Sequence, residues 1–196
     1  MDIINQSRQW ETALVGVSAH HVKRYMFAAN RVGQNMRVLD AACGCGYGAW
    51  LMFCVGGYVD GIDISGETIT FAKMHYPGPR YVCADLAKLP ERSIDHDLIV
   101  SFETLEHLAD PKPFLQAAQC KTLIASVPHE ELYPFKPETF KNDEYPHRRH
   151  YTPAQFEGLL RGCGFRVTES WCQTGKEYCD VRLGTDGKFL IYVCER

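Results

Sequence analysis

Several features that are common in secreted, membrane-spanning and nucleic-acid-binding chains are missing from this sequence. Residues 1–11 lack a basic region followed by an apolar run, so we expect no signal peptide. No apolar run approaches the roughly 20 residues that a helix needs to cross a bilayer. The net charge of −3 gives no general attraction to phosphate backbones or anionic lipids, although a local basic patch could still bind nucleic acid. We therefore expect a cytoplasmic protein with no membrane partner.

The cysteines lack the spacing of a metal site. Nine are scattered along the chain and no Cys-x-x-Cys pair occurs, which argues against a zinc knuckle. Several of them, including Cys54 and Cys194, lie inside apolar runs, so we interpret the cysteines as reduced and mostly buried thiols. No other spacing predicts a metal site. Any metal would have to be held by Asp and His side chains that folding brings together.

No internal repeat, low-complexity tract or long linker divides the 196 residues. A chain of this length forms one compact domain that hides roughly 70% of its unfolded surface. Short apolar strands alternate with helices as far as residue 127, and this alternation predicts a parallel sheet with helices on both faces. We expect strands at 36–42, 58–64, 80–84, 97–102 and 121–127, and helices at 18–31, 47–54, 66–75, 104–108 and 110–119.

The pattern changes after residue 127. Residues 129–150 are polar, contain proline and are rich in aromatic and histidine residues, without a clear period. We expect them to form an inserted loop that carries function. A helix at 152–161 and strands at 165–172 and 189–194 complete the chain, and the two strands could pair antiparallel. We interpret residues 1–196 as a single domain.

The most informative run covers residues 38–48, where a strand enters a glycine-rich turn that opens a helix. Backbone can approach a ligand closely in such a turn, and the helix offers free N–H groups. Gly44, Gly46 and Ala49 also satisfy a relaxed dinucleotide fingerprint. Asp40 favours a different ligand, because its carboxylate would repel a pyrophosphate but attract the ammonium and sulfonium groups of S-adenosylmethionine.

Two further acids end the next two strands of the predicted sheet. Asp63 lies where a carboxylate can accept both ribose hydroxyls of a nucleoside, and Asp85 lies where it can accept an adenine amino group. Each acid taken alone could instead cap the following turn or helix. Because Asp40, Asp63 and Asp85 end three successive strands, we favour a binding role for all three.

These runs together resemble the class I S-adenosylmethionine-dependent methyltransferases, especially the small-molecule type called methyltransferase type 11. The matching motifs are VLDAACGCGYG, GIDIS, YVCADLAKLP and DLIVSFETLEHLADP, with a looser match in RRHYTPAQFEGLLRGCGF. The resemblance implies an α/β fold, a Rossmann-like three-layer α/β/α sandwich with a mostly parallel seven-stranded sheet whose last strand is antiparallel. It further implies that residues 1–35 form a helical lid and that residues 129–150 are an insertion on the acceptor side.

The resemblance also implies which residues surround the methyl donor. Asp40 and the glycines would hold the methionine part, Asp63 the ribose, and Asp85 the adenine. The donor-binding candidates are Tyr25, Asp40, Ala41, Cys43, Gly44, Gly46, Asp63, Ile64, Asp85, Leu86, Phe102 and Glu103. Arg24, which precedes Tyr25, is a further candidate lid contact.

The chain departs from the family pattern in three places. Ala42 stands where many relatives have glycine, a change that is tolerated if the backbone angle there is ordinary. The Lys-Pro-Gly-Gly turn that usually precedes the fifth strand is missing, and Gln119 runs almost directly into that strand. His129 follows the fifth strand where relatives commonly have Asn, so the acceptor chemistry could differ.

Methyl transfer is an in-line displacement, so the protein has to align the acceptor, exclude water and, where needed, remove a proton. Imidazole suits proton removal near neutral pH. We therefore nominate His107, His129 and His150 as catalytic candidates, with His147 beside them. Each could instead be a supporting or surface residue, and the basic turn at 147–150 could be solvated or bind an acidic group of the substrate. The aromatic side chains of residues 129–150 could line the acceptor cavity or merely pack the loop.

The motif set favours a small-molecule O-, N- or C-methyltransferase. A nucleic-acid or protein methyltransferase on the same fold is the second hypothesis. However, no Asn-Pro-Pro-Tyr-like run follows the fourth strand, and no Pro-Cys nucleophile is present. The glycine-rich turn is also compatible with a non-catalytic S-adenosylmethionine-binding protein or with a nicotinamide-dependent dehydrogenase. The sequence does not indicate the oligomeric state or the identity of the acceptor.

Overall fold

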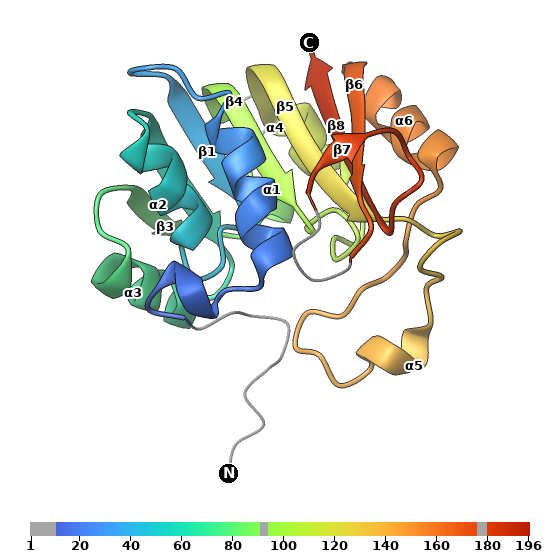
Figure 1. Ribbon diagram of the computed structural model, residues 1–196, viewed down its shortest axis with the longest axis horizontal. Helices are drawn as coiled ribbons and strands as arrows, with labels where there is room; N and C mark the ends of the chain where they lie inside the picture. Colours follow the sequence, from blue (N-terminus) through green and yellow to red (C-terminus); the bar gives the residue numbers. More distant parts are fainter. Residues whose placement is uncertain (1–10, 91–93, 176–179) are drawn as a thin grey trace.

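A computed structural model describes residues 11–90, 94–175 and 180–196. At its centre, these residues form an eight-stranded sheet in the order β3-β2-β1-β4-β5-β8-β6-β7 (Figure 1). The strands are β1 (Arg37–Ala41), β2 (Tyr58–Asp63), β3 (Arg80–Cys83), β4 (Ile94–Phe102), β5 (Ala118–Pro128), β6 (Arg166–Gln173), β7 (Arg182–Leu183) and β8 (Phe189–Glu195). The α-helices are α1 (Ala19–Ala29), α2 (Tyr47–Cys54), α3 (Gly66–His75), α4 (Lys112–Ala117), α5 (Pro137–Phe140) and α6 (Pro153–Gly162), and the short 3-10 helices are η1 (Leu14–Gly16) and η2 (Leu86–Lys88).

The first five strands are all parallel, and β8 enters between β5 and β6 in the opposite direction. This arrangement confirms the mostly parallel sheet with an antiparallel last strand, and β6 and β8 do pair antiparallel. The sheet has one strand more than the expected seven. The extra strand, β7, pairs with Trp171 and Cys172 of β6. Its two residues are too few to produce a periodic sequence pattern, so the sequence did not reveal it.

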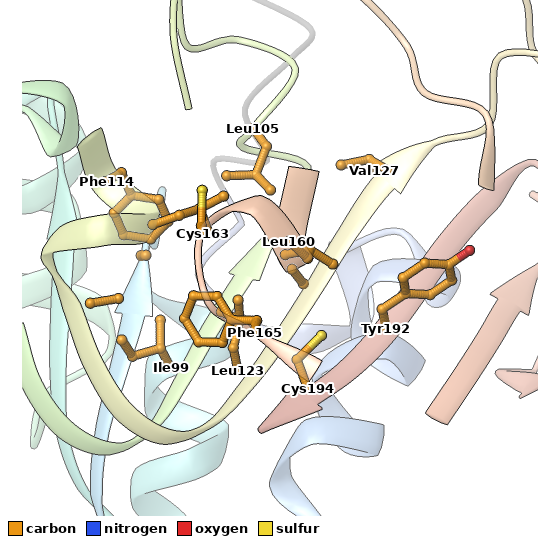
Figure 2. Close-up of a cluster of buried hydrophobic side chains, with 14 of the residues drawn as sticks. Ile99, Leu105, Phe114, Leu123, Val127, Leu160, Cys163, Phe165, Tyr192 and Cys194 are labelled. Carbon is orange, nitrogen blue, oxygen red and sulfur yellow. The ribbon is translucent and has the colours of Figure 1, made fainter. Parts of the chain in front are cut away.

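Helices cover both faces of the sheet, which confirms the three-layer architecture. Successive side chains of a strand point to opposite faces, so β1 sends Val38 to one layer and Leu39 to the other. One apolar core joins the sheet to α1, α2 and α3, and it includes Ala28, Val38, Met52, Ile69, Val100 and Ile124. The second core joins the sheet to α4 and α6, and it includes Leu39, Ile99, Phe114, Leu123 and Leu160 (Figure 2).

Two expected helices differ from those in the structure. Residues 104–108 form a turn rather than a helix. In this turn His107 donates its N–H to the carbonyl of Thr104, and Pro111 soon starts a new helix. The helix expected at 110–119 ends at Ala117, because Ala118 already adopts extended backbone as the first residue of β5. The missing Lys-Pro-Gly-Gly turn is thus replaced by a direct change from helix to strand.

The carboxyl ends of the five parallel strands share one edge of the sheet. Beyond this edge lies the segment of residues 129–150, which carries α5 and begins directly after β5 (Figure 1). Among the described residues, no helix combines the length and the apolar character that crossing a membrane requires. The eight cysteines among them are all free thiols.

Candidate functional site

The loop from β1 to α2 crosses the carboxyl edge of the sheet and depends on two glycines with left-handed backbone, Gly44 (φ +53°) and Gly46 (φ +89°). A Cβ on Gly46 would lie 2.6 Å from the Cβ of Ala72 and 2.9 Å from the hydroxyl of Tyr81, so close packing also requires glycine there. A Cβ on Gly44 would meet nothing within 4 Å. Gly44 therefore leaves open space above the loop, where a ligand could approach the backbone.

Ala42 has a backbone φ of +64°, so the condition under which we expected it to be tolerated is not met. An L-residue in the left-handed region costs roughly 1–2 kcal/mol, because its Cβ crowds the following carbonyl oxygen. The alanine that replaces the family's glycine is therefore a strained residue at the start of the glycine loop. The motif alone could not show this, because it does not give the backbone angle.

Asp40 is fully buried in the layer between the sheet and α1. Its Oδ1 accepts a hydrogen bond of 3.0 Å from the Tyr25 hydroxyl, while its Oδ2 has no hydrogen bond of normal geometry with any described residue. Burial raises the pKa of Asp40 to about 7; the hydrogen bond from Tyr25 opposes the rise, and the neighbouring Asp63 carboxylate adds to it. One buried acceptor oxygen is therefore available to a cationic donor group.

Asp63 connects the glycine loop to the turn that follows β2. Its carboxylate accepts hydrogen bonds of 2.9 Å from the backbone N–H of Gly44 and of Ser65, and one of 3.3 Å from the Thr68 hydroxyl. Asp63 thus has a structural role at the position where we expected the ribose. A ribose hydroxyl would have to share the carboxylate with these donors or replace one of them.

Asp85 lies just after β3, along the same edge, and caps η2. Its carboxylate accepts a 2.9 Å hydrogen bond from the backbone N–H of Ala87 and forms a 3.1 Å ion pair with Lys88. The capping role that the sequence left open for Asp85 is therefore present in the structure. Leu86, beside it, is buried.

The structure brings several other donor-binding candidates together around Asp40. Phe102, at the end of β4, packs edge-on against Tyr25 with a ring-centroid distance of 5.1 Å. Ala41 and Cys43, which follow Asp40 in the chain and flank Ala42, are also buried. Ile64, just after β2, is instead 44% exposed.

Arg24, which the sequence offered only as a lid contact, is almost completely enclosed near this edge, with 1% of its surface exposed. Its Nη1 lies 2.9 Å from Oε1 of Glu103, and its Nε donates to the Gln173 side chain at 2.9 Å. The guanidinium also lies over the ring of Phe189, 4.8 Å from the centroid. Its Nη2 has no hydrogen-bond partner among the described residues. A buried donor without a partner is therefore present on α1, in the residue that precedes Tyr25.

Glu103, which we expected to flank the donor, is committed to a protein contact. In addition to Arg24, it accepts a 2.7 Å hydrogen bond from the Ser126 hydroxyl. Its backbone φ of +49° places it in the left-handed region, at the point where β4 leaves the sheet. Glu103 therefore fixes the position of α1 against the carboxyl edge, because Arg24 belongs to that helix.

Two of the three nominated histidines, His129 and His150, differ in what their ring nitrogens bind. Nδ1 of His129 lies 3.1 Å from the carbonyl of Gly187 and donates to it, while the buried Nε2 makes no hydrogen bond but lies 3.6 Å from Oε2 of Glu131. His150 uses both nitrogens, one with the carbonyl of Tyr133 and one with His147. Of these two, the geometry leaves only His129 with a nitrogen that could accept a proton.

His107 belongs to a cluster with Glu106 and His147, in which one ligand atom from each residue lies within 4.8 Å of the others. Glu106 is fully buried, and burial, with the nearby Glu103 carboxylate, raises its pKa well above the ordinary range. Burial also lowers the pKa of His147 to about 3, with His107 and His150 contributing. Sequence reasoning missed Glu106 as a site residue, although it is half of the Glu-His pair in the fourth motif.

The segment 129–150 packs on itself and on the turn after β4. The rings of Phe140 and His147 stack with centroids 4.0 Å apart, and Phe135 stacks on Phe140 at 5.9 Å. Arg148 donates to the carbonyl of His107, and Arg149 to that of Ala109. The basic turn at 147–150 is therefore fixed to the protein, and the aromatic residues named here serve at least to pack the segment.

A hollow of about 390 Å³ lies at the opposite, amino-terminal edge of the sheet. Its charged residues already pair with one another or with neighbours, as Asp60 does with Arg80 at 2.7 Å and with His96 at 3.0 Å. In parallel α/β sheets ligands bind beyond the carboxyl ends of the strands. We therefore place the candidate site at the carboxyl edge rather than in this hollow.

Comparisons with known proteins identify relatives of this chain. Residues 39–120 match the family described as methyltransferase domain. A probable S-adenosylmethionine-dependent methyltransferase of Mycolicibacterium smegmatis is 30% identical over 140 residues, which are 68% of this chain and 53% of that protein. A ubiquinone biosynthesis O-methyltransferase of Thiobacillus denitrificans is 33% identical over 93 residues, which are 45% of this chain and 39% of that protein.

A structural comparison finds the same fold in magnesium protoporphyrin IX methyltransferase of Synechocystis with bound S-adenosylhomocysteine, with a TM-score of 0.62 and 20% identity. That match covers 90% of this chain and 80% of the other. The chain spans 29%, 53% and 39% of the length of three of the curated relatives that it matches. Residues 39–120 thus match the methyltransferase-domain family, and the fold of the chain is that of the class I S-adenosylmethionine-dependent methyltransferases.

Proposed function

We propose that this chain binds S-adenosylmethionine at the carboxyl edge of the sheet and transfers its methyl group to a small-molecule acceptor. One observation carries the donor assignment: a buried acceptor, Asp40 Oδ2, and a buried donor, Arg24 Nη2, both lack hydrogen-bond partners of normal geometry among the described residues, although the Ala49 backbone N–H lies close enough to Asp40 to lower its pKa. Leaving such groups unsatisfied costs roughly 1–3 kcal/mol each. The methionine part of the donor carries an ammonium and a carboxylate, which match these two groups.

The glycine loop fits the same ligand. Open space above Gly44 allows close approach to the backbone, while Asp63 holds that loop through the Gly44 N–H. A nicotinamide dinucleotide would instead bring its pyrophosphate to the loop, close to the Asp40 and Asp63 carboxylates. Asp63 would contact the ribose, and Asp85 with Leu86 the adenine.

Helix α1 would act as the lid over this site. Tyr25 covers Asp40 directly, and Arg24 anchors the helix to Glu103. Because Asp40 is fully buried, the donor can reach it only if α1 moves aside, and return of the helix would then exclude water. We propose that residues 1–35 provide this lid and that residues 129–150 border the acceptor.

The bound donor would supply a methyl group already activated by its sulfonium charge, so the protein's task is alignment and, for some acceptors, proton removal. His129 follows β5 at the carboxyl edge, its Nε2 makes no hydrogen bond, and the Glu131 carboxylate 3.6 Å away would stabilise the imidazolium once Nε2 has accepted a proton. We propose His129 as the proton acceptor. His150 is a poorer candidate, because both of its ring nitrogens are already hydrogen-bonded.

Two observations support a small-molecule acceptor. The relative from Thiobacillus denitrificans is named as an O-methyltransferase of ubiquinone biosynthesis. In addition, Arg148 and Arg149 bind backbone carbonyls of the protein rather than forming a free basic patch. Nucleic-acid binding through this turn would have to compete with those contacts.

The experiment is calorimetric titration of the purified chain with S-adenosylmethionine and S-adenosylhomocysteine, comparing wild type with Asp40→Asn. We expect the variant to bind at least tenfold more weakly, a loss of about 1.4 kcal/mol, because the charge facing the ammonium is gone. Glu138→Gln, which neutralises an exposed acid of α5, should bind as wild type does. Absence of heat with either ligand would refute the donor assignment.

The acceptor class is tested separately with isotope-labelled donor. We expect label to enter compounds of a small-molecule extract and not RNA, DNA or protein from the same cells. Labelled polymer would shift the assignment to a macromolecular acceptor. Donor binding without any labelled product across these pools would favour a donor-binding protein that catalyses nothing.

A further inference from the structure

Glu106, His107 and His147 meet although they come from two distant segments. Glu106 and His107 lie in the turn that follows β4, whereas His147 belongs to the segment 129–150. One ligand atom from each lies within 4.8 Å of the other two, and His107 Nε2 is 4.0 Å from Oε1 of Glu106. This cluster is not used by the proposed donor site, and it does not depend on that proposal.

Backbone carbonyls determine which nitrogen of each histidine carries its proton. Nδ1 of His107 lies 2.7 Å from the carbonyl of Tyr145, and a carbonyl can only accept, so Nδ1 is protonated and Nε2 keeps a lone pair. Nδ1 of His150 likewise donates to the carbonyl of Tyr133 at 2.6 Å, which leaves the Nε2 of His150 as an acceptor.

The position of the proton on His147 follows from that on His150. Its Nδ1 lies 2.9 Å from Nε2 of His150 and must therefore donate to it, so Nε2 of His147 also keeps a lone pair. Both histidines of the cluster thus present an unprotonated Nε2, with Nδ1–H fixed by a neighbour. Metal-binding histidines are held in this way, with the second ring nitrogen donating to a carbonyl or another acceptor.

Glu106 supplies the second, independent observation. Its side chain is fully buried, and neither carboxylate oxygen has a hydrogen-bond partner of normal geometry among the described residues. A buried carboxylate without donors is unfavourable unless a proton or a metal cation neutralises it. Together with the two nitrogen lone pairs, Glu106 would offer three electron-pair donors once a divalent metal ion displaces its proton, and such an ion fits all three.

We propose that Glu106, His107 and His147 bind a divalent transition-metal ion, with Zn²⁺ as the best fit. Two imidazoles and one carboxylate are an established ligand set for zinc, which leaves a fourth position for water or another oxygen. Ligand atoms on one zinc ion, each at about 2.0–2.1 Å, lie roughly 3.4 Å apart, so small side-chain movements would close the cluster around it. Hard ions such as Mg²⁺ prefer oxygen ligands and suit the site less well.

The ion would link the segment 129–150 to the end of β4. Backbone contacts already hold these parts together, since Arg148 N–H donates to the carbonyl of Glu106 at 2.8 Å. Metal binding would strengthen this link, because an ion that binds the folded chain raises its stability. As a ligand, His107 would not serve as the proton acceptor, which agrees with our choice of His129.

The test titrates the metal-stripped, reduced full chain with Zn²⁺ alone, without any methyl donor, and follows heat and thermal unfolding. We expect one ion per chain and a higher unfolding temperature. Glu106→Gln and His147→Ala should each bind at least about tenfold more weakly, since even loss of a residue that supports a metal ligand has that effect. His75→Ala, which removes an exposed histidine of α3, should bind as wild type does.

Co²⁺ serves as a spectroscopic probe that separates this site from the free thiols. We expect visible absorption without a strong thiolate charge-transfer band, and its loss in Glu106→Gln. Failure of wild type to bind either ion would overturn the proposal, as would unchanged binding in both variants or a thiolate spectrum. If His147→Ala does not fold, the near-isosteric Glu106→Gln and His107→Gln decide the question.

Discussion

At the scale of single residues, Asp40 and Ala42 show that this chain has a strained and poorly solvated turn at the carboxyl end of β1. Asp40 lies in the interior with one oxygen bound to Tyr25 and the other without a partner among the described residues. Two positions later, Ala42 adopts a backbone angle that favours glycine. Such features persist only where the surrounding structure enforces them, and they cluster at binding sites.

Asp40 predicts a pH-dependent stability. The folded chain keeps a proton on Asp40 up to about pH 7, whereas its ordinary pKa is 3.8, so the unfolded chain binds fewer protons between these values. The free energy of unfolding should therefore fall as the pH rises from about 4 to 7, and this contribution should be lost above pH 7. Urea titrations at pH 5 and pH 7.5 measure the fall.

Asp40→Asn should remove most of that fall, because an amide does not titrate. Glu138→Gln, at an exposed position, should leave the pH dependence as in wild type. An equal fall in wild type and Asp40→Asn would show that Asp40 ionises normally in the folded chain.

Ala42→Gly should stabilise the protein. Glycine relieves the left-handed strain, worth roughly 1–2 kcal/mol, but loses roughly 0.4–1 kcal/mol through the greater freedom of the unfolded chain. The net gain expected in the free energy of unfolding is about 0.5–1 kcal/mol, measured by urea denaturation. Ala29→Gly, within α1, should instead lower that free energy by roughly 1 kcal/mol. A destabilised Ala42→Gly would contradict the strain.

At the scale of elements, the docking of α1 on the sheet depends on the buried ion pair of Arg24 and Glu103. Removing one partner of a buried pair costs roughly 3–5 kcal/mol, because the other charge stays buried without compensation. Glu103→Gln should therefore lower the free energy of unfolding by roughly 3 kcal/mol. We expect the low end of that range because Gln173 still contacts Arg24 and Ser126 still contacts residue 103.

The matched control is Glu195→Gln, which breaks an exposed ion pair with Arg166. Such surface pairs contribute about 0–1 kcal/mol, so this variant should be close to wild type. Denaturant titration of both variants gives the comparison. Equal effects would mean that α1 is held by its apolar face alone.

Helix α6 begins with a capping box that Thr152, the residue before the helix, forms with Gln155. The Thr152 side chain accepts from the Gln155 backbone N–H at 3.2 Å, and the Gln155 side chain accepts from the Thr152 N–H at 2.9 Å. Thr152→Ala should lower the free energy of unfolding by about 1 kcal/mol. Thr152→Ser keeps the acceptor and should restore most of the loss in the same denaturant titration. If serine and alanine behaved alike, the cap would not contribute.

At the scale of the whole molecule, binding of the methyl donor and folding should be linked, because the residues that we propose to bind it come from α1, β1 and the loops after β2 and β3. A ligand at 100 times its dissociation constant stabilises the folded state by about 2.7 kcal/mol. For a chain of this size that corresponds to a rise of roughly 5–10 °C in unfolding temperature. S-Adenosylhomocysteine should give this rise in a thermal scan, and adenosine alone should give much less. No rise at saturating ligand would contradict the linkage.

The sequence by itself determined the order of the elements and the class of the fold. Alternation of short apolar strands with helices predicted a parallel sheet, since each pattern reports which side chains avoid water over a few neighbouring residues. The same local patterns identified the motifs at the ends of β1 to β4 and hence the family. Where the local pattern was short, it failed, as at β7 and in the turn at 104–108.

Only the tertiary structure decided what each polar side chain binds. The contacts of Arg24 with Glu103, of Asp63 with Gly44 and of Glu106 with His147 join residues that are distant in the chain. The backbone angle at Ala42 was likewise set by the path of the chain across the sheet edge. Local periodicity carries no record of such pairings, because they depend on where the folded backbone places the two partners in space.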